Sequence, residues 1–470
     1  MAGPPAAAKN TTKRTMHKSI QLARVLALAA ASTLPLAAAS EADDVRVLRE
    51  QVAALQQQLT ALTQRIEAKE QAPALAAPKI NLTDKGFSFS SADAANLIRF
   101  RGVAQFDSRV FLNDEGITNN SFLLRRARII TDGTFAKNYS FVFVPEFGGG
   151  SVSILDAAVG IAIDPALQLK FGKFTPPLGL ERLQGVCWNF LNEASLASNL
   201  VPVRDVGAQA SGALAKGVVN YAVGVFNGVA DNAASSNSDF DNDKEVMARV
   251  MVSPFKNAEQ SALRGLTAGV AASYGRSKTA SGRAAAYKTD GQQTFFSYNS
   301  SVVADGAAWR LVPQLDYRSG PLGVMSEYVV STVNLRPGAG APKVQLANRA
   351  WQLAAGYVLT GEASSYTGLT PRSNFDLAAG TWGAFEVVGR CSGFQVDDDA
   401  FPLLASAAAS ANEATSYAAG LNWYLSKTVL FSTDCYLTHF GFNAAAPATA
   451  TNAVLRQDEK ALIMRVQIAF

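Results

Sequence analysis

Residues that build catalytic or metal sites are scarce in this sequence of 470 residues. It has two histidines, and one of them, His17, lies in the N-terminal segment that is interpreted below as an export signal. His439 alone cannot form a histidine-based metal site. A serine hydrolase would also need this histidine beside a nucleophile and an orienting acid, and no motif marks such a group. We therefore expect no enzymatic activity, no cofactor and no bound metal.

Cysteine is rare as well. Cys187, Cys391 and Cys435 have no metal-ligand spacing and cannot form a disulfide framework, so we expect buried or incidental thiols. The glycine run 148–150 lacks the Lys-Ser/Thr pair of a phosphate-binding loop and is expected to be a turn. The acidic stretches 239–243 and 397–399 are expected to be solvated loops rather than Ca²⁺ sites.

The sequence has few charged residues and no long apolar runs beyond residue 40. Charged residues make up 17% of the chain, against about 25% in soluble domains, while 48% of residues are hydrophobic. Beyond residue 40 no run of about 18 apolar residues occurs, which excludes a transmembrane helix there. The remaining choices are a large soluble core or a β-barrel with an apolar outer wall.

The formal net charge of +4 comes from the N-terminus. Residues 1–40 hold five basic and no acidic side chains, and residues 41–80 hold five basic and six acidic ones. Residues 81–470 therefore carry 32 charges of each sign. This balance gives no reason to expect nucleic acid as a partner, and any preference for anions must come from local placement.

The N-terminus has the pattern of an export signal. A basic segment from Met16 to Arg24 precedes an apolar stretch from Val25 to Leu36 and the small residues Ala37–Ala39. We interpret residues 1–40 as a secretory signal peptide, with 1–15 as an upstream extension. The alternative, an N-terminal membrane anchor, is less consistent with so short and Ala-rich an apolar core.

A narrow heptad repeat follows in residues 41–80. Apolar residues alternate at spacings of three and four, and the other positions are largely polar, which is typical of a short coiled coil. We expect an oligomerising stalk, followed by a linker containing Pro73 and Pro78; the alternative is a helix packed on its own barrel. The repeat consists of Val45, Leu48, Val52, Leu55, Leu59, Leu62 and Ile66.

From about residue 86 the period changes to two, so residues 81–470 are expected to form a transmembrane antiparallel β-barrel. In Leu97–Val110, charged and amide side chains occupy one face and apolar ones the other. Similar segments recur to the end of the chain, with short polar turns alternating with long loops, as in outer-membrane barrels. The number of segments predicts about 16 strands, with 14 or 18 as alternatives.

The last nine residues carry the most specific local pattern. Leu462, Met464, Val466, Ile468 and Phe470 share one apolar face and end the chain on an aromatic residue. Such an ending resembles the signal by which bacterial outer-membrane barrels are recognised for insertion.

Short motifs spread over residues 96–470 resemble the phosphate-selective porin O/P family of Gram-negative outer membranes. They are Phe122–Arg128, Phe171–Pro177, Leu359–Glu362, Trp382–Arg390 and Gly420–Leu425. The resemblance implies a 16-stranded barrel in the outer membrane, a homotrimer, and a long loop folded into the lumen. It also implies a passive channel for phosphate or similar small anions, with outer-membrane lipid around it and the stalk in the periplasm.

In that family, transport is attributed to basic side chains along the pore, because a guanidinium binds phosphate with planar, bidentate geometry. The candidate constriction loop runs from Thr175 to Asp205 and holds basic and acidic residues. Arg126 and Arg128 are expected on the lumen face and Arg125 on the other face. The candidate pore-lining residues are Arg99, Arg101, Arg109, Arg126, Arg128, Arg182, Arg390 and Arg465.

Three alternatives remain open. In the first, the arginines form salt bridges in the lumen with Asp107, Glu146 and Glu386 and do not select anions. In the second, the channel is a non-selective general porin. In the third, the protein is structural, and its stalk tethers the outer membrane to a periplasmic partner.

Overall fold

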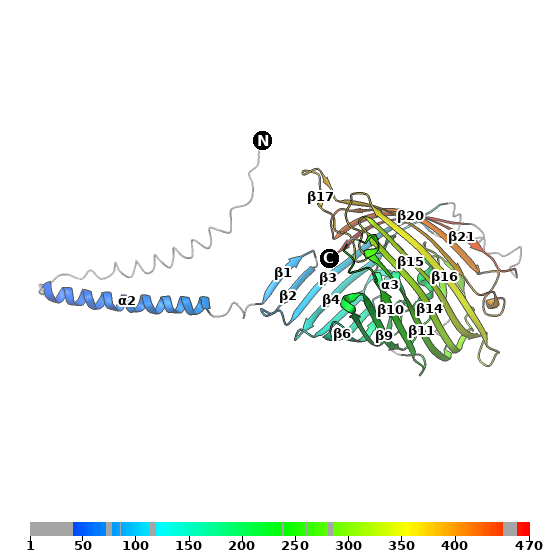
Figure 1. The fold of residues 1–470 in the computed structure, drawn as a ribbon, viewed down its shortest axis with the longest axis horizontal. Coiled ribbons are helices and arrows are strands. Elements are labelled where there is room, and N and C mark those ends of the chain that lie inside the picture. Colours follow the sequence, from blue (N-terminus) through cyan, green and yellow to red (C-terminus); the bar gives the residue numbers. More distant parts are fainter. Residues whose placement is uncertain are drawn as a thin grey trace. The chain divides into compact units, whose positions relative to one another are not determined.

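A closed antiparallel β-barrel of 16 strands forms the body of the protein. The computed structural model describes residues 41–71, 78–84, 86–112, 119–236, 239–259, 261–280, 285–444 and 458–470. The predicted signal peptide (1–40) and the central part of the predicted linker (72–77) lie outside the described residues. The sheet is drawn in Figure 1, where consecutive strands lie side by side around the barrel.

The barrel strands follow the chain order without crossover. They are β3 (Leu97–Phe111), β4 (Ser121–Phe135), β5 (Tyr139–Glu146), β6 (Ser153–Asp164), β7 (Leu167–Phe174), β8 (Asp205–Leu214), β9 (Val219–Phe226), β10 (Glu245–Val252), β11 (Leu266–Ala280), β14 (Val303–Ser319), β15 (Leu322–Arg336), β16 (Val344–Val358), β19 (Ala384–Gln395), β20 (Glu413–Tyr424), β21 (Val429–Gly441) and β22 (Glu459–Ala469).

The described residues also form three hairpins, six short helices and one long helix, α2. The hairpins are β1 (Lys79–Thr83) with β2 (Gly86–Ser90), β12 (Ala286–Lys288) with β13 (Thr294–Ser297), and β17 (Phe375–Asp376) with β18 (Thr381–Trp382). The helices are α2 (Glu41–Gln71), α3 (Leu180–Gln184), η2 (Gly148–Gly150), η3 (Leu196–Leu200), η4 (Ala215–Gly217), η5 (Ala262–Gly265) and η7 (Asp398–Ala400).

The sixteen segments with period-two alternation correspond one to one to the barrel strands, so that prediction is confirmed. The structure extends several strands beyond the predicted segments; β14, for instance, begins at Val303 rather than Trp309. Sequence reasoning missed the β1–β2 hairpin, because two five-residue strands beside a linker give too short a pattern to recognise.

The barrel closes where the chain ends. Strand β22 pairs with β3, and the backbone N–H and C=O of Phe470 exchange hydrogen bonds of 3.1 and 3.0 Å with Gly102. Nearer the start of β3, its neighbour is β2 instead of β22, and Phe87 lies opposite Phe100. The terminal residue therefore completes the ladder between the first and last strands, which leaves no open edge there.

The two ends of the barrel differ. Connections 136–138, 165–166, 320–321 and 425–428 are short and lie at one end, whereas 175–204, 227–244, 281–302 and 396–412 at the other end are long. We call them the short-turn end and the long-loop end. Connection 359–383 is an exception, since it joins β16 to β19 at the short-turn end with 25 residues.

Helix α2 belongs to a separate unit, residues 1–75. The predicted heptad positions whose side chains are described are all exposed along it: Leu48, Val52, Leu55, Leu59 and Leu62. Among the described residues, no helix is both long and apolar enough to cross a membrane.

Closure by Phe470 can be tested at Gly102. A Cβ atom there would lie 2.8 Å from the Phe470 ring, whereas one at Gly389, also on the outer face, would meet only a carbonyl oxygen at 3.7 Å. We expect Gly102→Val to lower the free energy of unfolding by about 1–3 kcal/mol, because the ring must move. Urea unfolding in detergent checks this, with Gly389→Val as control; equal midpoints would contradict the role given to Phe470.

Candidate functional site

The loop between β7 and β8, residues 175–204, folds into the barrel. Leu178, Leu196 and Leu200 are fully buried in it. They belong to one apolar cluster with lumen-facing side chains of β14, β15 and β16, including Val312 and Val329. Because apolar side chains on the inner wall have no lipid to face, covering them with the loop removes them from water. The loop therefore packs on the β14–β16 wall.

A second loop fills the same half of the lumen. The β12–β13 hairpin places Tyr287, Phe295 and Phe296 in that apolar cluster, each 1% exposed. The Asn199 amide donates to the Lys288 carbonyl (2.9 Å) and accepts from the Lys288 N–H (3.0 Å), as a paired strand would. The constriction loop is thus held from the long-loop end as well.

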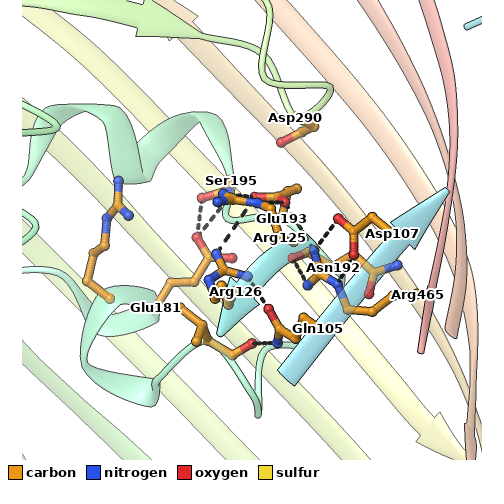
Figure 2. A network of polar contacts seen from close by, with 12 residues as sticks. Gln105, Asp107, Arg125, Arg126, Glu181, Asn192, Glu193, Ser195, Asp290 and Arg465 are labelled. Atoms are coloured by element: carbon orange, nitrogen blue, oxygen red, sulfur yellow. Dashed lines mark hydrogen bonds and ion pairs between the residues drawn. The ribbon is translucent and has the colours of Figure 1, made fainter. Parts of the chain in front are cut away.

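Glu193, in the central part of the loop, attaches it to β3, β4 and β22 (Figure 2). Its carboxylate accepts from Arg125 of β4 at 2.6 and 2.9 Å, from Arg109 of β3 at 2.8 Å and from Arg465 of β22 at 3.1 Å. Asp107 takes two further bonds from Arg465, at 2.6 and 2.8 Å. Burial alone would raise the pKa of Glu193, but the charges of Arg125, Arg126 and Arg465 together outweigh it and hold that pKa well below its usual range.

Further ion pairs hold the loop near its start, at Glu181. Arg390 of β19 binds Glu181 at 3.0 Å and Asp290 of the second loop at 2.8 Å. The other Glu181 oxygen accepts the hydroxyls of Ser195 (2.7 Å) and Ser198 (2.8 Å) within the loop. Each acid of this group is therefore occupied by a partner.

The placement of Arg125 corrects one prediction. Strict alternation assigns it to the face opposite Arg126, but the register between β3 and β4 shifts at Gln105/Phe106. This bulge lets Arg125 reach Glu193 while Arg126 also remains inside, 8% exposed. A signal was available in the sequence, because an arginine on the lipid face is costly and an irregular strand avoids it.

A cavity of about 340 Å³ remains between the loop and the wall of β4, β5 and β6. Its lining includes six basic residues and three acidic ones. The acids are Glu146, Glu181 and Glu193, and each is already ion-paired. The basic residues are Arg125, Arg126, Arg128, Arg182, Arg204 and Lys288.

Two of these arginines are poorly neutralised. Arg182 donates only to neutral acceptors, the Ser198 carbonyl (2.9 Å) and the Asn232 amide oxygen (2.6 Å), and among the described residues no carboxylate pairs with it. Arg126 donates to Gln105 at 2.5 Å and lies 4.0 Å from Glu193, which three other arginines share. Burial lowers the pKa of Arg182 to about 10, so its guanidinium is still charged at neutral pH.

The predicted pore-lining arginines separate into three groups. Arg126, Arg128 and Arg182 line the cavity. Arg109, Arg390 and Arg465 lie in the ion pairs that hold the loop. Arg99 and Arg101 share Asp132 toward the short-turn end.

The alternative salt bridges are present in part. Arg465 binds Asp107, and Arg128 binds Glu146 at 2.6 Å. Glu386 instead accepts hydrogen bonds from Tyr424 and Asn422, and no basic side chain pairs with it in the described part of the chain. Pairing therefore accounts for some of the predicted arginines and leaves the cavity residues Arg126 and Arg182 without a carboxylate of their own.

Sequence reasoning missed the inner part of connection 359–383. Tyr366 donates to the Leu180 carbonyl of the constriction loop at 2.5 Å. Gly368, with φ of 101°, lies against the Trp188 indole, where any Cβ would collide with the ring. A cavity of about 1030 Å³ beside these residues is lined by Arg99, Arg101, Trp188 and Arg372, among others. The unusual length of this connection was the available signal.

A sixteen-stranded closed barrel with a loop folded inside it and a charged cavity beside that loop has the architecture of outer-membrane porins. Of the solved structures, the outer membrane channel DcaP of Acinetobacter baumannii has a TM-score of 0.52 at 11% identity, covering 81% of this chain and 99% of that one. OmpT of Vibrio cholerae has a TM-score of 0.50 at 9% identity, covering 80% and 98%. These identities show the fold alone.

The sequence model of the family described as phosphate-selective porin O and P matches residues 98–470, so the chain belongs to this family of outer-membrane porins. No curated protein matches the sequence. The predicted membership, the barrel and the outer-membrane location are confirmed.

The role of Glu193 can be tested by Glu193→Gln. The change removes the charge that Arg109, Arg125 and Arg465 share, and breaking a buried pair usually costs about 3–5 kcal/mol. We expect that loss in the free energy of unfolding, together with faster protease cleavage within residues 175–204. Glu259→Gln, the same change at an exposed site, is the control. An unchanged cleavage rate would mean that other contacts hold the loop.

Proposed function

We propose that this porin is a passive diffusion channel that prefers anions, with phosphate or similar small anions as solutes. The observation that carries the proposal is the cavity beside the constriction loop, where basic residues outnumber acidic ones and the acids are already ion-paired. The family name agrees with this solute class.

The physical argument concerns what an ion meets in the passage. An anion beside Arg126 and Arg182 would replace part of its hydration with guanidinium N–H donors, because both side chains have donors that no carboxylate occupies. A cation there would be repelled by the same positive guanidinium groups. Several such sites of moderate strength favour conduction over trapping.

The reversal potential in a planar bilayer under a salt gradient tests the proposal. Removing one unit charge about 4 Å from the ion changes the ion's energy by about 1 kcal/mol in water, or about fivefold in local anion concentration. We expect anion preference in the wild-type protein, a decrease of about this size in Arg182→Gln, and a larger one when Arg126→Gln is added.

Arg264→Gln is the matched control, because Arg264 is an exposed arginine on the connection between β10 and β11. It should leave the reversal potential unchanged. A wild-type reversal potential near zero would instead favour the non-selective porin, and cation preference would contradict the proposal outright.

We also propose that residues 41–80 form a periplasmic coiled-coil stalk that joins three copies, and that residues 1–40 are removed on export. The support is the exposed apolar seam of α2, since Leu55, Leu59 and Leu62 each remain more than half exposed in the single chain. Coiled-coil association would bury that seam.

Deleting residues 41–71 tests the stalk. We expect weaker association of the purified protein at low concentration, measured by sedimentation, with unchanged single-channel conductance. Leu55→Asp with Leu59→Asp should act as the deletion does, whereas Gln56→Asp with Gln57→Asp, outside the seam, should not. Unchanged association in the deletion would exclude this role and leave the tether alternative to be tested by envelope stability.

A further inference from the structure

The outer part of connection 359–383 forms an exposed hairpin. Strands β17 and β18 pair Phe375 with Trp382, and Figure 1 shows the hairpin projecting from the barrel near the C-terminus. Leu377 at its tip is 72% exposed and Trp382 is 55% exposed. From 373 to 383 the only charged residue is Asp376. A hairpin this apolar is unusual among turns that face only water.

The hairpin is fixed in place. The Phe375 N–H donates to the Leu425 carbonyl at 2.6 Å, and the Trp423 indole N–H donates to the Trp382 carbonyl at 2.7 Å. The Asp376 carboxylate accepts the N–H groups of Ala378 and Ala379, so its charge supports the turn. These bonds orient the apolar side chains outward from a defined backbone.

The apolar side chains continue the outer wall of the barrel. On β19 and β20, Val387 lies opposite Leu421, and both are exposed on the outer face. Two residues nearer the short-turn end, Phe385 stacks on Trp423 with ring centroids 5.7 Å apart. The hairpin adds the next row, because Phe375 lies 5.3 Å from Trp423 and 5.7 Å from Trp382.

Toward the short-turn end, the outer face thus changes from aliphatic to aromatic side chains, as expected where the hydrocarbon core of the bilayer gives way to lipid headgroups. Aliphatic side chains suit the hydrocarbon region, and tryptophan is enriched at the interface, where its ring is buried and its N–H is hydrogen-bonded. We propose that the 373–383 hairpin is a membrane anchor, whose tip at Leu377 inserts into the lipid interface of the leaflet at the short-turn end. The barrel wall beneath it faces the same lipid.

Depth-dependent fluorescence quenching tests the anchor on the whole protein. In a background with Cys187→Ser, Cys391→Ser and Cys435→Ser, Leu377→Cys carries an environment-sensitive dye, and the porin is reconstituted in phosphatidylcholine vesicles with nitroxide-labelled lipids. We expect quenching at least about twofold stronger from a headgroup-proximal nitroxide than at the control site. The control is Asn138→Cys, on an exposed short turn at the same end.

Three results would overturn the proposal. Quenching by aqueous iodide equal to that at residue 138 would place the tip in water. Protection from both lipid nitroxide and iodide would mean that a second protein chain covers it. Lipid quenching that persists unchanged in Trp382→Ser would mean that the aromatic row does not hold the tip. If the dye prevents folding, intrinsic tryptophan quenching by brominated lipid, compared between wild type and Trp382→Phe, gives the same decision: equal quenching would overturn the proposal.

Discussion

The charge of Glu193 holds the loop 175–204 in place inside the barrel. It is buried with arginines from β3, β4 and β22, the strands on either side of the barrel closure. A buried carboxylate without these partners would be very unfavourable, and the arginines without it would be unfavourable as well. The loop that carries Glu193 is therefore held on this side of the lumen, while its apolar half is held against β14–β16. One cavity remains beside β4, β5 and β6, and a second lies beside Arg99 and Trp188.

The same attachments explain how a neutral barrel can present a basic passage. Residues 81–470 have equal numbers of acids and bases, so any local excess must arise from uneven pairing. Asp107, Glu181, Glu193 and Asp290 are used to hold loops. Arg126 and Arg182 have no carboxylate of their own. Local separation of charge, rather than composition, supports the proposed preference for anions.

The strands and the constriction loop could be predicted from sequence because each follows from a local pattern. Period-two alternation locates a strand, and a long gap between two strands locates a loop such as 175–204. The side chain of Arg125 was placed on the wrong face, because a one-residue bulge does not interrupt the period-two pattern. The cost of an arginine that faces lipid was the signal that could have revealed it. The sequence also could not predict which arginines are neutralised by a carboxylate, because partners such as Arg465 and Glu193 are 272 residues apart.

The β17–β18 hairpin shows another limit. Its connection is rich in Gly, Ala and Ser and has no period, so the sequence does not predict this hairpin. The role proposed for it depends on where the chain returns, next to Trp423, and on which end of the barrel it occupies. Both are properties of the closed barrel rather than of the segment.

In the proposed channel, anions pass the loop along the β4–β6 wall. Anomalous diffraction from crystals of the porin soaked in bromide would locate them directly. We expect a bromide peak within hydrogen-bond distance of Arg126 or Arg182, in the cavity beside the loop. Bromide found along the β14–β16 side of the lumen, or a cavity without bromide while surface sites are filled, would contradict it.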